Sequence, residues 1–493
     1  MRFSEVLSTT KVIATNIVNF DFCIGKICSD TEKIKPGDIF VCRCGVRQDA
    51  HDYIECAHKL GAKAFVVEHV TPYLKKNPGI RYVAVKDTSL AEVNMLDCYY
   101  THVAKHMKLI GITGTNGKTS SAYMLKAIFD AAGHKTGLIS TIKVLAGDKD
   151  ITCAKFNSMT TPSPAELYSY LSDMYKEGVD TVIMEASSHA LVQKRLDALH
   201  FSLGIFTNLS EDHLDFHKNM QDYRNAKAHL FELCDKALIN TDSPDGKEIL
   251  SGVPCLSYSY SQYAAADFCP QNPHCDSRGT SFTLSYNGNK LDITCPLCGE
   301  FTLYNALAAA SGAIMEGIDG EIIKKALANM PQIPGRLEKI DCGSGISVYI
   351  DFAHTPDALE KTLSTLKKLC TGRLITVFGC GGDREREKRP IMGRIATSVS
   401  DYTIITSDNP RNEEPQKIIS EILCGVKRNA DFRVIENRRE AIHSALSHAR
   451  NGDIVLLAGK GHENYEIVGK EKRAFSEREI IGKYFADINR DKK

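Results

Sequence analysis

Short apolar runs alternate with longer amphipathic stretches along nearly the whole chain. Apolar runs bounded by polar turns are typical of strands buried in a parallel sheet, and amphipathic stretches are typical of the helices that cover it. Residues 1–100 show this pattern on a small scale and predict a compact α/β unit. The expected elements are strands at Asp38–Cys42, Ala64–Glu68 and Tyr82–Val85, a helix over His51–Leu60, and a linking helix over Leu90–Met107.

A second α/β region is expected over residues 101–335, where strand and helix patterns alternate and so predict a mostly parallel sheet with helices on both faces. Between Tyr258 and Pro296 the pattern changes. There Thr280–Tyr286 alternates strictly and Asn287-Gly288 follows as a hairpin turn, so a small antiparallel insertion is expected. The parallel strand candidates are Leu109–Thr113, Thr181–Glu185, Leu203–Asn208 and Ala237–Asn240.

A third region begins after Pro334-Gly335-Arg336, where the alternation of strands and helices restarts. It predicts a doubly wound, Rossmann-like unit over residues 336–493. Three domains agree with a length of 493 residues, which is too long for one hydrophobic core. The strand candidates of this unit are Ser347–Ile350, Leu374–Phe378, Tyr402–Thr406, Phe432–Ile435 and Asp453–Ala458.

The charge balance favours small-molecule chemistry. The chain has 61 basic and 61 acidic residues, so its net charge of zero gives no bulk attraction to nucleic acid or to an anionic membrane. No apolar leader opens the chain, and no stretch approaches the ~20 apolar residues of a membrane span. A cytoplasmic protein is expected, acting as a monomer with neither nucleic-acid nor membrane partners.

Cysteine usage is typical of a reducing compartment. The 17 cysteines are odd in number and lack the regular spacing of a disulfide framework, so reduced thiols are expected. Cys295-Pro-Leu-Cys298 is an isolated C-x-x-C, and a zinc site would need further ligands, for which Cys275 is the nearest candidate. Ordinary thiols are the simpler interpretation.

The most informative segment is Lys108–Ser120, a short apolar strand that enters a glycine-rich loop just before a helical pattern. Backbone N–H groups of such a loop and of the helix start bind phosphate oxygens, the lysine adds charge, and the threonine hydroxyl can ligate Mg²⁺. The first glycine, Gly111, stands one residue earlier than the general motif requires. The alternative is an ordinary strand-to-helix turn with a chance lysine. The loop residues are Gly114, Thr115, Asn116, Gly117, Lys118 and Thr119.

Acidic and histidine residues follow two further strands of the central region. Glu185 stands at the end of a predicted strand, where a carboxylate beside a phosphate loop can hold Mg²⁺. The alternative for Glu185 is an ion pair with an arginine. The stretch from Asn208 to His217 is rich in Asp, Glu and His, which suggests a site with His213 as a metal ligand; a merely exposed loop histidine is the alternative.

Two later helices carry further candidates. Tyr223, Lys227 and Phe231 share a helix face, which would place the lysine among less polar neighbours, where it loses its proton readily. A surface lysine lying along an amphipathic helix is the alternative. Asn305 opens a helix of small residues, and it either reads an adenine edge or caps the helix.

Three polar loops follow predicted strands of the last region, and the carboxyl ends of such strands line a common crevice. Arginines there are suited to clamp a carboxylate and a glutamate to grip an ammonium, which together fit a zwitterionic amino acid. Each charged residue alone is also compatible with a surface ion pair. The candidates are Arg384, Asp408, Asn409, Arg411, Gly459 and Glu463.

These strings, in this order, resemble the Mur ligase family, the ATP-dependent amide-forming enzymes of peptidoglycan assembly, over essentially the whole chain. The resemblance is to members that add the third residue of the stem peptide. It implies that residues 1–100 bind the UDP end of the substrate, residues 101–335 bind ATP, and residues 336–493 bind the amino acid. The implied reaction is ATP-dependent ligation through an acyl phosphate.

The resemblance also implies roles for individual residues. Lys118 and Thr119 would bind ATP and Mg²⁺, Glu185 and His213 would help to hold magnesium, and Lys227 would be the carbamylated lysine of the family. Asn305, Arg336 and Asp351 would serve the nucleotide. The implied contacts to UDP-muramoyl-dipeptide are Thr160, Thr161, Ser187, Gln193 and Arg195 for the muramoyl-dipeptide part, and Asp30, Thr31, Gly45, Asp49 and His51 on the uridine side.

The chain departs from the family pattern at one place. Members usually have Asp-Ser-Arg where this chain has Asp30-Thr31-Glu32, which keeps a hydroxyl but reverses a charge. Arg411 favours meso-diaminopimelate as the acceptor, since lysine-adding relatives generally lack this arginine. The alternatives are a lysine-adding or other Mur ligase, a folylpolyglutamate-type ligase and, from another class, a P-loop nucleotide switch. His354 is an interdomain candidate without an assigned role.

Overall fold

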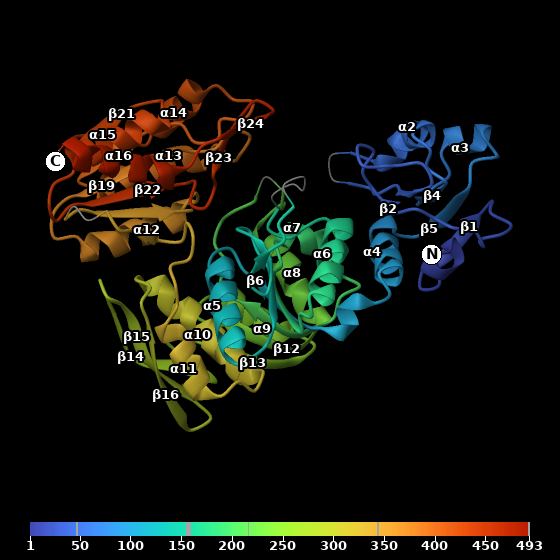
Figure 1. The fold of residues 1–493 in the computed structure, drawn as a ribbon, viewed down its shortest axis with the longest axis horizontal. Helices are drawn as coiled ribbons and strands as arrows, with labels where there is room; N and C mark the ends of the chain where they lie inside the picture. Colours follow the sequence, from blue (N-terminus) through green and yellow to red (C-terminus); the bar gives the residue numbers. More distant parts are fainter. Residues whose placement is uncertain (46–47, 154–158, 215, 343–344, 492–493) are drawn as a thin grey trace.

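The computed structural model describes residues 1–45, 48–153, 159–214, 216–342 and 345–491. Figure 1 shows three α/β bodies in a row, with the blue N-terminal body at one end, the red C-terminal body at the other and the P-loop strand β6 (Lys108–Thr113) in the middle one. Each body has its own sheet, of five, eleven and six strands among the described residues. The fold is therefore α/β throughout, as the hydrophobic pattern predicts.

The first sheet has the strand order β1-β5-β4-β3-β2, with only β1 antiparallel to its neighbour. The three predicted strands are confirmed, whereas β1 and β2 were missed, because β2 has only two residues and β1 is largely exposed. The elements are α1 (Phe3–Val6), β1 (Val12–Thr15), β2 (Ile27–Cys28), β3 (Ile39–Val41), α2 (Ile54–Lys59), β4 (Ala64–Val67), α3 (Pro72–Lys76), β5 (Tyr82–Val85) and α4 (Thr88–Tyr99).

The linking helix predicted over Leu90–Met107 is wrong in its second half. Helix α4 ends at Tyr99, and Thr101 and His102 adopt positive φ values of 52° and 55°, which a continuous helix of L-residues cannot contain. A hydrogen bond of 2.5 Å between His102 Nδ1 and the Asp97 carboxylate accompanies this break. The chain then passes through a 3₁₀ turn and enters β6.

The central sheet has the order β16-β15-β14-β13-β12-β11-β6-β10-β7-β8-β9. The four predicted strands, β6, β10, β11 and β12, are parallel, and β7, which was not predicted, pairs parallel to β10. The predicted antiparallel segment exists, but β14 pairs with β13, so it extends the central sheet instead of forming a separate insertion. Its turn at Asn287-Gly288 has positive φ at both residues (47° and 76°), as a type I′ hairpin requires.

Both faces of the parallel core are covered. Leu109 of β6 packs in one apolar cluster with helix α6, and the next residue, Ile110, packs in another with α5 and α10. The elements are α5 (Lys118–Ala131), β7 (Thr136–Ile139), β8 (Val144–Ala146), β9 (Lys149–Asp150), α6 (Pro164–Lys176), β10 (Thr181–Glu185), α7 (Ser188–Val192), β11 (Phe201–Phe206), α8 (Met220–Ala228), β12 (Cys234–Asn240), α9 (Pro244–Gly252), β13 (Leu256–Tyr260), β14 (Phe268–Asp276), β15 (Gly279–Tyr286), β16 (Asn289–Cys295), α10 (Glu300–Met315) and α11 (Gly320–Ala328).

The third sheet has the order β17-β18-β22-β19-β20-β21 and is parallel apart from β17, so the doubly wound prediction is confirmed. A separate hairpin, β23–β24, follows the last strand of the sheet. The elements are β17 (Glu338–Ile340), β18 (Ser347–Asp351), α12 (Pro356–Leu369), β19 (Leu374–Phe378), α13 (Lys388–Val399), β20 (Tyr402–Ile405), α14 (Pro415–Leu423), β21 (Phe432–Val434), α15 (Arg438–His448), β22 (Ile454–Ala458), β23 (Tyr465–Val468), β24 (Glu471–Ala474) and α16 (Glu477–Asp491).

Two compositional expectations are also tested by the structure. All 17 cysteines are free thiols, and Cys275, Cys295 and Cys298 form no group with metal-ligand spacing among the described residues. No helix in the described ranges is both long and apolar enough to cross a membrane.

Candidate active site

The glycine-rich loop connects β6 to α5, and its two glycines have backbone conformations that other residues rarely adopt. Gly114 and Gly117 have φ values of 144° and 87°. A Cβ at Gly114 would lie 1.9 Å from Thr207 Oγ1, and one at Gly117 would lie 2.5 Å from Asn305 Oδ1. The loop is thus a tight turn at the start of a fourteen-residue helix, as a phosphate-binding loop requires.

Neighbouring loops fix the phosphate loop in place. The backbone N–H of Asn116 donates to Asn208 Oδ1 over 2.9 Å, and Thr207 Oγ1 donates to the carbonyl of Asn116 over 2.6 Å. Asn305 lies in the second turn of α10, where Gly299 is the N-cap, so the capping interpretation of Asn305 is wrong. Its buried amide instead accepts a hydrogen bond of 3.4 Å from Ser121 of α5.

Two lysines converge on one carbonyl of this loop. Lys118 Nζ donates to the carbonyls of Gly114 and Thr115 over 2.8 and 2.9 Å, and Lys227 Nζ donates to the same Gly114 carbonyl over 2.8 Å. Burial lowers the pKa of Lys118. Burial, with the nearby Lys118 charge, lowers the pKa of Lys227 well below its usual value.

Lys227 is buried, so the surface-lysine interpretation is wrong. Its side chain on α8 is 1% exposed, and its Nζ lies 4.3 Å from the centre of the Tyr223 ring. Phe231, on the same face one turn later, is also buried. The predicted apolar face is therefore confirmed. Its lysine is readily deprotonated, and the amine faces the phosphate loop.

Glu185 ends β10 and is completely buried. It accepts hydrogen bonds from Thr119 Oγ1 (2.8 Å), from the Thr141 N–H (2.9 Å) and from Thr141 Oγ1 (3.0 Å). The predicted alternative of an arginine partner is not what the described residues show, because Arg336 donates to Thr119 Oγ1 over 3.1 Å instead. Thr141, which the sequence did not single out, completes this carboxylate's surroundings.

His213 lies near both lysines on the loop after β11. It adopts a φ of 57°, and its Nε2 lies 3.4 Å from an Asp212 carboxylate oxygen. Burial, helped by the Lys118 and Lys227 charges and opposed by that of Asp212, lowers the pKa of His213 to about 4. The imidazole is neutral at pH 7 and so keeps the lone pair that a metal ligand needs. Asp215, in the same acidic stretch, lies outside the described residues.

The C-terminal body contacts the phosphate loop directly. Besides the Arg336 contact with Thr119, Asp357 at the start of α12 accepts a hydrogen bond of 3.0 Å from Asn116 Nδ2. Asp351 accepts from the Leu337 and Ala353 N–H groups over 2.6 and 2.9 Å. Asp351 therefore fixes two backbone segments of the C-terminal body close to Arg336.

His354 is also at this junction. Its Nδ1 donates to the Phe352 carbonyl over 2.8 Å, and burial lowers its pKa to about 4. Burial lowers the pKa of His462 to about 3, and its Nδ1 has no hydrogen-bond partner among the described residues. Sequence reasoning missed His462 and Asp357, because only the fold shows that they face the central body.

The residues implied for the muramoyl-dipeptide form one hydrogen-bonded group. Thr161 Oγ1 donates to the Glu185 carbonyl over 2.7 Å and lies 3.1 Å from Ser187 Oγ. Arg195 donates to the Thr161 carbonyl over 2.8 Å and to Gln193 Oε1 over 2.6 Å. Thr160 joins the group through Thr141, whose Oγ1 lies 3.0 Å from Thr160 Oγ1.

The N-terminal body reaches this group through Arg43, which donates to the Gln193 carbonyl over 2.8 Å. Asp30 and Thr31 follow β2, where Asp30 Oδ1 accepts from the Glu32 N–H over 2.9 Å. Lys33 Nζ lies 3.5 Å from Asp30 Oδ2 and 3.1 Å from Glu166 at the start of α6. The Glu32 side chain is exposed, so the charge that departs from the family pattern faces solvent.

The other uridine-side candidates lie on the loop after β3. Asp49 Oδ1 accepts from the His51 N–H over 2.9 Å and lies 2.6 Å from His51 Nδ1, and the Gly45 N–H donates to the Gln48 carbonyl. His51 Nε2 accepts from the Glu68 N–H over 2.9 Å. Cys44, Asp49 and His51 have metal-ligand spacing, but both ring nitrogens of His51 are already engaged by Asp49 and by the Glu68 N–H.

The acceptor candidates meet at the carboxyl edge of the third sheet, as predicted. Asn409 Nδ2 donates to Glu463 Oε2 over 2.8 Å, and a Cβ at Gly459 would lie 2.6 Å from an Asp408 oxygen. Burial raises the pKa of Glu463, and the Asp408 charge raises it further. Sequence reasoning missed Lys460, a fully buried lysine whose Nζ donates to Asn409 Oδ1 over 3.0 Å.

The two acceptor-side arginines flank one glycine. A Cβ at Gly381 would lie 2.8 Å from Arg411 Nη1 and 3.9 Å from Arg384 Cγ. Arg384 is exposed, and Arg411 donates to the Gly382 carbonyl over 2.7 Å. Burial lowers the pKa of Arg411, and the Arg384 charge lowers it further. No carboxylate ion pair with either arginine is found among the described residues, so the surface ion-pair interpretation does not hold for them.

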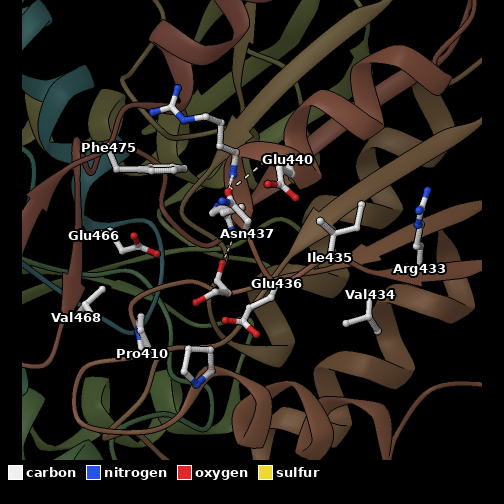
Figure 2. A pocket seen from close by; sticks show the side chains of 14 residues that line it. Pro410, Arg433, Val434, Ile435, Glu436, Asn437, Glu440, Glu466, Val468 and Phe475 are labelled. Atoms are coloured by element: carbon white, nitrogen blue, oxygen red, sulfur yellow. Dashed lines mark hydrogen bonds between the residues drawn. The ribbon is translucent and has the colours of Figure 1, made fainter.

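An open cavity of about 750 Å³ lies next to this crevice, between the end of β21, the start of α15 and the β23–β24 hairpin. Figure 2 shows Pro410, Glu466, Val468 and Phe475 around one side of it. None of the six acceptor candidates lines it. Because Arg411 pairs with Val468, the hairpin separates this cavity from the crevice.

Three α/β bodies, a phosphate loop in the middle one and a charged crevice on the last define a nucleotide-dependent ligase of modular construction. Family models match this chain twice, as the Mur ligase middle domain over residues 112–313 and as the Mur ligase glutamate ligase domain over residues 335–461. The chain belongs to the Mur ligase family.

The similarity to known proteins extends over the whole length. A UDP-N-acetylmuramoyl-L-alanyl-D-glutamate–2,6-diaminopimelate ligase of Clostridium botulinum is 42% identical over 467 residues, covering 94% of this chain and 96% of its own. A solved structure of a ligase of that name aligns with a TM-score of 0.68 and 27% identity, covering 99% of both chains. A Mycobacterium tuberculosis folylpolyglutamate synthase shares the fold alone, with 19% identity, a TM-score of 0.62 and coverage of 75% of this chain and 92% of its own.

Proposed function

We propose that this protein joins meso-diaminopimelate to the D-Glu γ-carboxylate of UDP-N-acetylmuramoyl-L-alanyl-D-glutamate in peptidoglycan synthesis, with conversion of ATP to ADP and phosphate. One observation carries the proposal. A phosphate loop in the central body and a crevice with two arginines and a glutamate in the last body occur together in a chain 42% identical to a ligase of that name.

The three bodies would divide the substrates between them. Residues 1–100 would bind the UDP end through Asp30, Thr31 and the loop around His51, and residues 101–335 would bind ATP and the muramoyl-dipeptide. Residues 336–493 would bind the amino acid. All of these groups come from one chain, so a monomer suffices for the proposed site.

The residues present fit a nucleotide and its magnesium ions. Glu185 is a buried carboxylate whose hydrogen-bond donors among the described residues are all neutral, and Thr119 and the neutral His213 offer further ligands. Lys227 has the lowered pKa that reaction with CO₂ needs, and a carbamate would convert this amine into an anionic ligand. Magnesium would neutralise the phosphate charge that opposes approach of the substrate carboxylate.

In the first step a γ-carboxylate oxygen of D-Glu would attack the terminal phosphorus of ATP, and the bond from phosphorus to the ADP oxygen would break. Lys118 would turn from the loop carbonyls to the phosphate oxygens, while Arg336 would bring a charge from the C-terminal body. Asn305 would contact the adenine. Each of these groups acts by binding and by neutralising charge, which is the main requirement of phosphoryl transfer.

In the second step the amino group of diaminopimelate would attack the acyl carbon, lose a proton, and expel phosphate. Glu463 with Asp408 would grip the ammonium of the acceptor's other end, while Arg384 and Arg411 would bind its carboxylates. The crevice lies on a different body from the phosphate loop, so docking of the last body would bring amine and acyl phosphate within ~3–3.5 Å.

Phosphate release measured with each substrate omitted in turn tests this function. Release should need ATP, the UDP-muramoyl-dipeptide and an amino acid together, with meso-diaminopimelate far better than lysine or D-glutamate. A lysine-adding ligase would reverse that order, and a folylpolyglutamate-type enzyme would need a folate acceptor. Slow release that ignores every acceptor would identify a P-loop switch and would refute the proposal.

A further inference from the structure

The two acceptor-side loops hold like charges close together. Arg384 and Arg411 come from the loops after β19 and β20, and a Cβ at Gly381 would lie within 4 Å of both side chains. Two guanidinium groups repel each other, and the Arg384 charge is one cause of the lowered pKa of Arg411. Some other part of the fold must therefore keep these loops together before an anionic ligand arrives.

A buried arginine behind the loops meets that need. Arg389, on α13, has 0% exposure, and its guanidinium faces Glu413 with both terminal nitrogens, Nη1 to Oε2 at 2.9 Å and Nη2 to Oε1 at 2.8 Å. Its Nη1 also donates to Glu421 Oε2 over 2.7 Å. This two-point arrangement fixes orientation as well as distance, which a single contact cannot do.

The same pair holds two backbone groups of the loop after β19. Arg389 Nη2 donates to the Gly381 carbonyl over 3.2 Å, and Glu413 Oε1 accepts from the Asp383 N–H over 2.6 Å. Glu413 itself lies two residues after Arg411. The pair thus joins the loop that carries Arg384 to the loop that carries Arg411 and Glu413.

Direct contacts between the loops depend on this register. The Gly382 N–H donates to the Asn409 carbonyl over 2.9 Å, and Arg411 Nη1 donates to the Gly382 carbonyl over 2.7 Å. A shift of the first loop would move Gly382 and so would turn the Arg411 guanidinium. The orientation of the Arg411 guanidinium therefore depends on the register of the two loops.

We propose that Arg389 and Glu413 are positioning residues that set the separation and orientation of Arg384 and Arg411, and thereby select an acceptor with a second carboxylate. The inference rests on the proposed function. A buried ion pair adds little net stability compared with apolar residues of similar size, so geometry is the better explanation of its presence. Neither residue is among those proposed to bind the acceptor.

Glu413→Gln tests the inference, because it keeps the shape of the side chain and removes the negative charge that binds both terminal nitrogens of Arg389. Arg389→Lys is the second variant, which keeps the charge but cannot make two parallel contacts. Arg386→Met is the matched control: Arg386 also contacts Glu413, at 3.2 Å, but half of its side chain is exposed, and among the described residues its side chain has no hydrogen bond to the backbone of either loop. Kinetic constants are measured for diaminopimelate, lysine, ATP and the UDP substrate.

The KM for diaminopimelate should rise about 10-fold to 100-fold in Glu413→Gln and in Arg389→Lys, since a misplacement of about 1 Å costs that much. The KM values for ATP and the UDP substrate should stay within about 2-fold of wild type. Preference for diaminopimelate over lysine should fall by the same factor as the diaminopimelate KM rises. Arg386→Met should behave as wild type.

An unchanged diaminopimelate KM in both variants, or an equal rise for all substrates, would overturn the inference, since the second result indicates general loss of structure. A wild-type KM for diaminopimelate in Arg389→Lys would also overturn it, because a positive charge alone would then suffice. These results concern the variants only. If wild type itself does not ligate diaminopimelate, the proposed function fails and this inference fails with it.

Discussion

Replacing Lys227 tests two proposed properties of this residue separately. One is the lowered pKa of its buried amine, and the other is its requirement for activity. Lys227→Met keeps the length of the side chain but removes the amine, whereas Lys227→Ala leaves an empty space beside the phosphate loop. The wild-type amine donates to the Gly114 carbonyl over 2.8 Å and is otherwise next to the Tyr223 ring. The activity of both variants should fall by about 10²-fold or more, which is the loss expected when one group that stabilises developing charge is removed.

The lowered pKa of Lys227 should also make the free energy of unfolding depend on pH. Burial lowers the pKa of Lys227 well below its usual value, so between the folded and unfolded pKa values the unfolded chain binds the extra proton. The free energy of unfolding of wild type then rises with pH, by about 1.4 kcal/mol per pH unit in that window. Lys227→Met lacks this slope, although loss of the bond to Gly114 costs it about 1–3 kcal/mol.

The assay is denaturant unfolding of wild type and Lys227→Met from about pH 7 to about pH 10 in CO₂-depleted buffer, which keeps the amine free. The free energy of unfolding of Lys227→Met, relative to that of wild type, should be highest at the lowest pH and should fall progressively as pH rises. Activity is measured separately with bicarbonate present. Added formate or acetate should partly rescue Lys227→Ala, which has room for a carboxylate, and should not rescue Lys227→Met.

Parallel pH profiles for wild type and Lys227→Met would show that Lys227 is not a depressed amine in the folded protein. A fully active Lys227→Ala would exclude the carbamate. Rescue of both variants by acetate would also refute the reasoning, since methionine leaves no space for the anion.

Three further predictions concern the acceptor, the pH range and the domain junction. Arg411→Ala should lower kcat/KM for diaminopimelate by about 10² and that for lysine much less, since only the former leaves a carboxylate unpaired; equal losses would make Arg411 structural. His354, whose pKa burial lowers to about 4, binds a proton more weakly when folded, so stability should fall as pH drops from about 6.5 towards 4, by up to about 1.4 kcal/mol per pH unit. Denaturant titrations at several pH values should give a flatter profile for His354→Asn, and an unchanged profile would refute the assignment. Gly335→Ala should cost more than about 2 kcal/mol in the melting of the C-terminal body, because its Cβ would lie 2.1 Å from the His462 backbone nitrogen. Gly317→Ala is the control, with a φ of 84° and nothing within 4 Å of the added atom, and equal losses in both variants would refute the steric argument.

The parts of this fold that local sequence determines were predictable. The apolar run before Gly114 becomes β6, and the following helix begins at Lys118, because strand and helix periodicity and glycine positions act within a few residues. The same holds for the hairpin at Asn287-Gly288. The helix predicted through Met107 was wrong because the left-handed break at Thr101 and His102 involves residues that are not glycine.

Contacts between distant segments were not predictable. Asp357 is 241 residues from Asn116, its partner on the phosphate loop, and nothing in either local pattern indicates the pairing. Arg389 reads as one more charge in a stretch of mixed acidic and basic residues, although the fold buries it completely. The burial of Lys227 is intermediate: its helix face could be predicted, but the Gly114 carbonyl beside it could not.

The proposed roles of individual residues came from resemblance, and the geometry supports some of them more directly than others. Glu185, Thr119 and Lys118 lie together around the phosphate loop, and Asn409 contacts Glu463 in the acceptor crevice. Asp351 contacts backbone groups of its own body, so its part in nucleotide binding stays a prediction. The roles of Asp30 and Thr31 also stay predictions.

The most direct test of the account is the fate of a carboxylate oxygen. The UDP-muramoyl-dipeptide is labelled with ¹⁸O in its D-Glu γ-carboxylate, and the phosphate released during ligation of diaminopimelate is examined by mass spectrometry. An acyl phosphate requires one labelled oxygen in each phosphate that accompanies an amide product. Release of unlabelled phosphate would contradict ligation by carboxylate activation in this protein, whether or not the amide product forms with it.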